Sequence, residues 1–291
     1  MSAVAVSASA ARAVGRVRTG LSVRHSLPGE AALVVAVYAL YQTTRGVVAG
    51  DRTVAVRHAH DVVSIERSLH VFVEGNVQRT AEHVSGLIGT LGLAYLTLHL
   101  AITGSVLIWL HRRRPAEYPF VRTTLLLASG LALVGYLAFP TAPPRLSGIG
   151  ILDTVTRHGH VNLNKGLVSS LYNPYAAVPS MHTAYAVIVG STLVLLGRNV
   201  VTRIAGVVYP LLVVLAIVAT GNHFLLDAAA GALVAALAAG ATALLLQRPP
   251  LIERLGALLR SPAPVLDRPA ARPTPAMAVA SADGCAGDVR R

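Results

Sequence analysis

Long apolar stretches alternate with short polar and basic segments along most of this chain. A helix needs roughly 20 mostly apolar residues to cross the hydrocarbon core of a membrane. Stretches that meet or approach this requirement cover 31–50, 84–110, 119–140, 181–196, 204–220 and 224–246. The pattern therefore predicts an all-α fold, a polytopic membrane helical bundle with about six transmembrane helices.

Residues 51–78 follow a different pattern, because aliphatic and charged side chains are interleaved throughout this stretch. It is too polar to cross a bilayer, and it predicts an amphipathic helix or helix pair at the membrane interface. The ends of the chain are different again. Residues 1–28 are basic and 251–291 are rich in Pro and Ala, so we expect disordered tails around one membrane-embedded domain, 29–250. The N-terminal composition also fits an organelle transit peptide.

Composition and charge support the membrane assignment. Hydrophobic residues make up 54% and charged residues 13% of the chain, whereas soluble domains average about 25% charged residues. The net charge of +12 would suggest nucleic acid in a soluble protein. Here the arginines gather in a tail and in short turns, so we expect no nucleic-acid partner. The single cysteine, Cys285, excludes an intrachain disulfide and a cysteine metal cluster.

Arginine clusters also indicate orientation, because positive residues favour the cytoplasmic side of a membrane. In a six-span topology one side carries the N-terminal tail, Arg112–Arg114, Arg198, Arg203 and Arg248. The predicted location is therefore the plasma membrane, with both termini in the cytoplasm. The segments 51–78, 141–178 and 221–223 then lie on the extracytoplasmic side.

Two histidines start apolar helices on that side. His223 and Asp227 are one helical turn apart and share a face. A carboxylate that accepts the proton of one imidazole nitrogen raises the basicity of the other, as a histidine nucleophile requires. An acidic residue inside an apolar span is costly and indicates a functional site. Taken alone, a structural His–Asp pair between helices explains the pattern equally well.

His182 follows Ser180, which is a good N-cap for the helix 181–196. The N-terminus of a helix attracts anions through its N–H groups and its dipole. His182 would then lie beside a bound phosphate and could protonate a leaving alcohol. Taken alone, the pattern fits an ordinary cap with an interfacial histidine. Arg145 follows two prolines, and it is either a bidentate phosphate ligand or an interfacial topology residue.

Together these residues resemble a known family. FPTAPPR (139–145), NPYAAVPSMH (173–182) and NHFLLD (222–227) are similar to motifs of the type-2 phosphatidic acid phosphatase superfamily. The fuller pattern looks most like the branch that contains fungal inositol phosphorylceramide synthase. The resemblance covers roughly 45–231. It implies a six-span bundle that transfers phosphoryl groups through a phosphohistidine, without a metal or other cofactor. By motif match it makes His223 the nucleophile, Asp227 its orienting partner, His182 the acid and Ser180 a phosphate contact.

The chain departs from the superfamily at a few positions. Ala216 and Ile217 stand where many members carry a Ser-Arg pair, and Met181 replaces a glycine. Phosphate must then be held by another residue, for which Arg145 is the first candidate and Arg67 and Arg45 are weaker ones. We expect His158, His160 and Lys165 to be loop residues near the lipid headgroup, without an assigned role.

The predicted substrate is a phospholipid or a polyprenyl-type lipid phosphate. With water as acceptor the protein would be a phosphatase, and with an alcohol it would be a phosphotransferase. Two other classes stay open at this point. Intramembrane His, Asp and Arg also mark the pathways of transporters and channels. His182, His223 and Asp227 would also suit a zinc-dependent hydrolase.

Overall fold

The computed structural model describes residues 26–47, 51–154 and 175–247. In these residues the regular structure is helical, and one isolated parallel β-bridge joins Thr141 to Ala176. The all-α prediction is confirmed. A π-helical segment, η1 (Ala94–Leu98), joins α5 to α6, and η2 (Pro144–Leu146) is a short 3-10 turn. The helices are α2 (Leu27–Val47), α3 (Arg52–Ser68), α4 (Glu74–Glu82), α5 (Leu87–Leu93), α6 (His99–Arg113), α7 (Tyr118–Ala138), α10 (Met181–Leu196), α11 (Val200–Ala219) and α12 (Leu225–Leu246).

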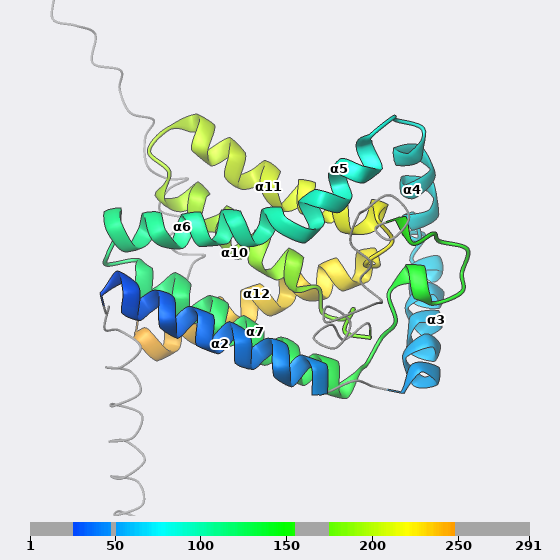
Figure 1. Ribbon diagram of the computed structural model, residues 1–291, viewed down its shortest axis with the longest axis horizontal. Helices are drawn as coiled ribbons and strands as arrows, with labels where there is room; N and C mark the ends of the chain where they lie inside the picture. The colour runs from blue at the N-terminus through cyan, green and yellow to red at the C-terminus, as the bar shows by residue number, and fades with distance from the viewer. Residues whose placement is uncertain (1–25, 48–50, 155–174, 248–291) are drawn as a thin grey trace, which may run out of the picture.

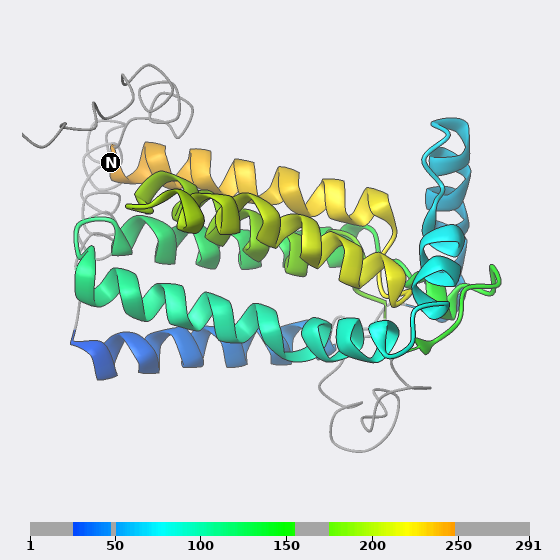
Figure 2. The ribbon, with the colours of Figure 1, turned by 90° about the horizontal axis from the view of Figure 1, so that it is seen from above.

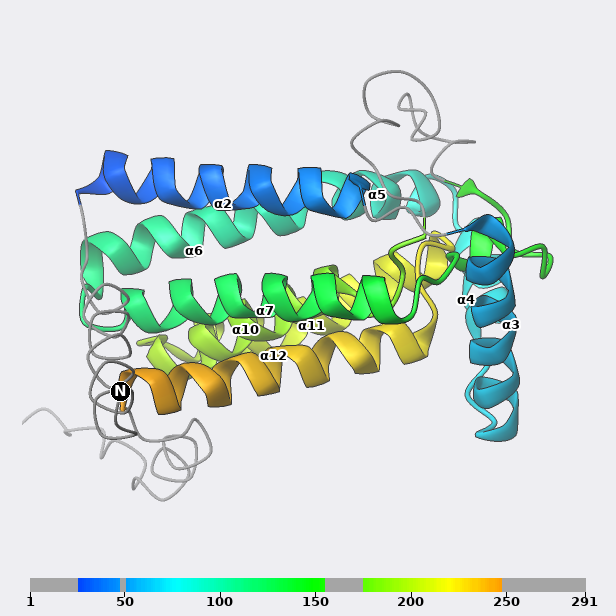
Figure 3. The ribbon, with the colours of Figure 1, turned by 90° about the horizontal axis from the view of Figure 1, so that it is seen from below.

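The long helices lie side by side in one bundle, and α3 and α4 cover one of its ends (Figure 1). At the opposite end lie the start of α2, the α6–α7 turn, the α10–α11 turn and the end of α12 (Figures 1 and 3). The arginines of the two turns, Arg112–Arg114, Arg198 and Arg203, therefore share one end of the bundle. The starts of α10 and α12 lie at the other end, so both histidine motifs are next to α3 and α4 (Figure 2).

Three helices, α7, α11 and α12, are long and apolar enough to cross a membrane. The apolar helix α10 has the predicted bounds but is shorter, at 16 residues. Many aliphatic side chains on the outside of the bundle are exposed, for example Leu211 and Leu244. An apolar exterior of this kind is expected where lipid replaces water. The protein is therefore membrane-embedded, as its composition indicated.

Small residues bring the helices behind the site close together. A Cβ atom on Gly231 of α12 would lie 2.2 Å from the backbone carbonyl oxygen of Ser180, and one on Gly190 of α10 would lie 2.4 Å from that of Gly206 in α11. Both distances are far below van der Waals contact. Glycine at these positions lets backbones approach closely, as is common between membrane helices. The crossing of α12 with the start of α10 brings the two histidine motifs together.

Helix α3 is tied to the segment that follows α7. Ala142 N donates to Ala55 O at 3.0 Å, and the His58 ring bonds Pro140 O at 2.8 Å while stacking on Phe139. The prediction of an amphipathic helix pair for 51–78 agrees with α3 and α4. Their buried faces, however, pack on protein, because they contact the loop 139–147 and the start of α12.

Candidate functional site

His223 lies in a tight turn between α11 and α12. Gly221 has a φ of 69°, a conformation that glycine adopts without strain, and the backbone N–H groups of Asn222 and His223 both donate to Ile217 O. Asp227, in the first turn of α12, accepts a hydrogen bond from Phe224 N at 2.9 Å. The same oxygen of Asp227, Oδ2, lies 3.2 Å from Nδ1 of His223. Because a carboxylate accepts, Nδ1 of His223 carries the proton in this pairing, and Nε2 is left with its lone pair.

His182, in the first turn of α10, faces His223. The centroids of the two rings are 5.7 Å apart, so one phosphate group can reach both. The structure therefore brings together the two histidines that the sequence placed on separate helices. His182 is held by two further rings. Tyr95 stacks on it with centroids 4.4 Å apart, and His99 contacts it edge-on at 4.3 Å.

Tyr95 and His99, which both contact His182, lie at the π-helical segment η1. A π-bulge widens one helical turn and is frequent at functional sites. Tyr95 lies in η1 and His99 is the first residue of α6. Nδ1 of His99 is buried and makes no standard hydrogen bond to any described residue, although the Tyr95 carbonyl interacts with the ring. Hydropathy treated 84–110 as one uniform span, so these two residues were missed.

Ser180 is the N-cap of α10, as predicted, and its hydroxyl accepts from Thr183 N at 3.4 Å. Its backbone N–H donates to Asp227 O at 3.0 Å. Ser180 is fully buried, and it joins the start of α10 to the first turn of α12. The hydroxyl of Ser180 thus caps α10, while its backbone N–H ties α10 to α12.

Arg145 is buried beside the turn that carries His223. Its Nε donates to Asn222 Oδ1 at 3.0 Å, its backbone N–H donates to Gly221 O at 3.0 Å, and its Nη1 forms an ion pair with Asp153 at 2.9 Å. The guanidinium is therefore fixed one residue from His223. A preorganised cation at such a place suits a phosphate oxygen.

Paired histidines with a carboxylate partner, a cation and a helix N-terminus together suit phosphoryl transfer. The family model described as PAP2 superfamily matches residues 60–241, more than half of the chain. The chain belongs to the PAP2 superfamily. No curated protein and no solved structure matches it. Members of the PAP2 superfamily are phosphatases and phosphotransferases, which supports an enzyme of this kind.

Two buried carboxyl groups at the PAP2 site were not anticipated from the sequence. Glu74 of α4 accepts from Leu225 N at 2.8 Å, and Glu66 of α3 accepts from Leu226 N at 2.6 Å. Both side chains are fully buried. They satisfy N–H groups that the start of α12 leaves unpaired. Burial raises the pKa of Glu66 to about 8, the bond from Leu226 N–H opposes this, and the nearby Glu74 adds to the rise.

The other candidates contribute less to the site or lie outside the described residues. Arg67 is exposed, and its guanidinium lies over the Phe72 ring, 5.1 Å from the centroid. His158, His160 and Lys165 belong to the stretch 155–174, and the side chain of Arg45 is also outside what the structure describes.

A second buried polar cluster lies at the opposite end of the bundle. Arg122 of α7 forms an ion pair with Glu30 of α2 at 2.7 Å, and the Tyr118 hydroxyl donates to Glu30 at 3.0 Å. No local pattern predicts this pairing, because Arg122 and Glu30 belong to different helices.

Proposed function

We propose that this PAP2 protein is an integral membrane enzyme that transfers a phosphoryl group from a lipid phosphoester through a phosphohistidine on His223. The proposal depends mainly on one observation. The rings of His182 and His223 lie 5.7 Å apart, and Asp227 holds Nδ1 of His223. This arrangement matches a nucleophile with its orienting carboxylate, opposed by an acid.

In the first step, Nε2 of His223 attacks phosphorus and forms a P–N bond. The P–O bond to the lipid alcohol breaks, and protonated His182 donates its proton to the departing oxygen. Asp227 stabilises the positive charge that His223 acquires, because its carboxylate is fully buried at 3.2 Å from Nδ1. Tyr95 stacks on His182 and holds the ring in position for this proton transfer.

In the second step, neutral His182 takes a proton from the acceptor. The acceptor oxygen bonds to phosphorus, the P–N bond breaks, and His223 is regenerated. Water as acceptor gives dephosphorylation, and an alcohol gives phosphotransfer. The similarity of 139–145 and 173–182 to the inositol phosphorylceramide synthase branch favours an alcohol.

Phosphate binding is assigned to two features. Arg145 supplies charge beside the turn of His223. The start of α10 supplies a positive dipole end, which Ser180 shapes as the N-cap. This assignment needs no metal.

We further propose that α2, the α5–η1–α6 helix and α10 cross the membrane together with α7, α11 and α12, giving about six crossings. The basic turns then face the cytoplasm, and the histidines act at the extracytoplasmic face of the plasma membrane. The substrate is a phospholipid or polyprenyl-type lipid phosphate. A transporter is less favoured, because the His182–His223 cluster gathers at one end of the bundle.

The test is turnover of a lipid phosphate by purified protein in phosphatidylcholine vesicles. Dioleoyl phosphatidic acid supplies the phosphate, and either water or added myo-inositol supplies the acceptor. His223→Ala is expected to abolish both products. His83→Ala, which removes an exposed histidine of the same chain, is the matched control and should leave turnover unchanged. Equal turnover in the two variants would exclude His223 as the nucleophile.

A further inference from the structure

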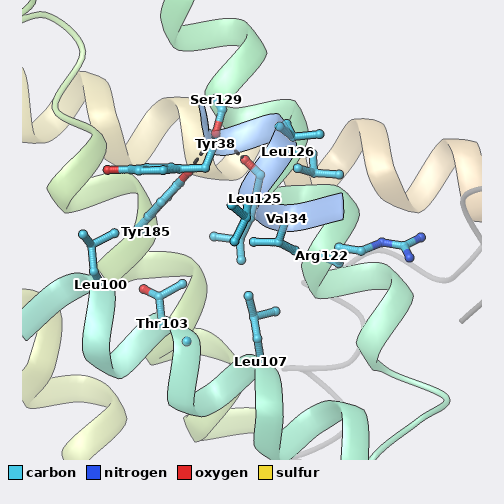
Figure 4. A pocket seen from close by; sticks show the side chains of 13 residues that line it. Val34, Tyr38, Leu100, Thr103, Leu107, Arg122, Leu125, Leu126, Ser129 and Tyr185 are labelled. Atoms are coloured by element: carbon cyan, nitrogen blue, oxygen red, sulfur yellow. Dashed lines mark hydrogen bonds between the residues drawn. The ribbon is translucent and has the colours of Figure 1, made fainter. Parts of the chain in front are cut away.

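A half-open cavity of about 290 Å³ lies between α2, α6, α7 and α10. Its lining is mostly aliphatic, with Leu100, Leu107 and Leu125 among the wall residues (Figure 4). Thr103, also in the wall, has a buried hydroxyl without a hydrogen-bond partner among the described residues. Such an unsatisfied group in a cavity is an expected contact for a ligand oxygen.

The cavity begins next to the histidine cluster. Leu100 follows His99, which touches His182, and Tyr185 is one turn along α10 from His182. Tyr185 is hydrogen-bonded to Ser129 at 2.8 Å, so its ring forms the wall nearest the site. From Leu100 to Leu107, α6 rises by about 10 Å. The cavity therefore leads away from the site along the bundle axis.

The far end of the cavity is closed by Arg122. Its carbon stem lines the wall (Figure 4), while its guanidinium pairs with Glu30 at 2.7 Å and lies over the Tyr118 ring. A long cationic side chain can cover apolar space in this way with its charge satisfied elsewhere. The ion pair thus holds Arg122 in place at this end of the cavity, and this limits how far an apolar ligand can extend.

We propose that this cavity binds one hydrocarbon chain of the lipid whose phosphate lies between His182 and His223, and that the Arg122–Glu30 pair sets the longest chain accepted. This inference rests on the proposed function, because it takes the substrate to be a lipid phosphoester. A chain arriving from the bilayer is already in apolar surroundings. Its binding therefore serves mainly to orient the phosphate for attack.

Gly104 offers a direct way to fill the cavity. It lies in the wall, and an added Cβ atom would meet nothing within 4 Å. Gly104→Phe therefore places a ring in the cavity without a backbone clash. Gly130→Phe is the matched control, because Gly130 also has open space around its Cβ but is exposed on α7 and does not line the cavity.

The first assay compares hydrolysis of dioleoyl phosphatidic acid in phosphatidylcholine vesicles with hydrolysis of water-soluble para-nitrophenyl phosphate. Gly104→Phe is expected to lower kcat/KM for the lipid by about 10–100-fold and to leave the soluble substrate unaffected. Gly130→Phe is expected to affect neither. An unchanged lipid rate in Gly104→Phe overturns the proposal. Gly104→Leu repeats the test if the larger ring prevents folding.

A second measurement does not depend on turnover. Phosphatidic acid that carries a diazirine near the end of its acyl chain is photolysed with the protein, and the labelled peptides are mapped. Labelling within 100–107 that is lost in Gly104→Phe and kept in Gly130→Phe supports the chain site. Labelling that is the same in all three proteins overturns it. Absence of turnover with retained, cavity-specific labelling would contradict the proposed function alone.

Discussion

Glu66 gives the most detailed prediction, because its buried carboxyl group joins α3 to the helix that carries Asp227. Its pKa is raised from 4.5 to about 8, mainly by burial and then by the neighbouring Glu74 and Asp227, against the bond from Leu226 N–H. Between pH 4.5 and pH 8 the Glu66 carboxyl is protonated in the native state and ionised in the unfolded state. The contribution of Glu66 to native stability is therefore fully present below pH 4.5 and is lost as pH rises through 8.

One such proton makes the free energy of unfolding fall by up to about 1.4 kcal/mol per pH unit. Glu66→Gln removes the titration and keeps an oxygen that can accept from Leu226 N–H. The measurement is the midpoint temperature of thermal unfolding in detergent, at several pH values between 5 and 8.5. Unfolding is monitored by the fluorescence of Trp109. The native protein is expected to lose stability through this window, and the Gln variant is expected to lose clearly less.

Glu82→Gln is the control, since Glu82 is an exposed carboxylate of α4. It should reproduce the native pH profile. If Glu66→Gln showed the same decline with pH as the native protein, the carboxyl at the start of α12 would not be the titrating group. Glu66→Ala, which leaves a buried N–H unpaired, should cost about 1–3 kcal/mol at pH 5, where the native carboxyl is protonated.

Three further predictions concern the site and its support. His182→Ala should slow lipid substrates with poor leaving groups more than it slows para-nitrophenyl phosphate, and equal losses would argue against an acid role. Gly231→Ala should sharply reduce turnover, because its Cβ would clash with Ser180 O. Gly240→Ala is the control, because Gly240 has open space around it, and it should keep its turnover. Equal activities of the two variants would show that the close approach of Gly231 to Ser180 does not position the histidines. Glu30→Ala should destabilise the protein by about 3–5 kcal/mol, because it removes the carboxylate that pairs with the buried Arg122. Glu30→Leu with Arg122→Leu should recover most of that loss. Thermal unfolding measures both variants, and a single variant as stable as the native protein would refute the argument.

Hydropathy and motif order predicted much of this molecule. The apolar stretches correspond to helices because backbone groups in lipid must pair within the helix, and α10 has the predicted bounds Met181–Leu196. The N-cap role of Ser180 follows from local chemistry, which a sequence shows directly. The pairing of His223 with Asp227 is likewise local, since one helical turn separates them.

The parts that sequence could not predict depend on distant contacts. Glu66 and Leu226 are 160 residues apart, and Glu30 and Arg122 are 92 apart. No local pattern indicates which buried carboxyl meets which N–H or guanidinium. The π-helical segment was missed for a different reason. Its sequence, Ala94–Leu98, is mostly apolar like its surroundings, so hydropathy gives no sign of the π-helical turn that carries Tyr95.

The central claim is that His223 becomes covalently phosphorylated during turnover. Rapid acid-free quenching of the enzyme with ³²P-labelled phosphatidic acid, followed by peptide mapping, tests it most directly. We expect label on His223 that is stable in alkali and lost in acid, as a phosphoramidate requires, and much less label in Asp227→Asn. Full turnover with no labelled enzyme, or label on His182 in place of His223, would contradict the account.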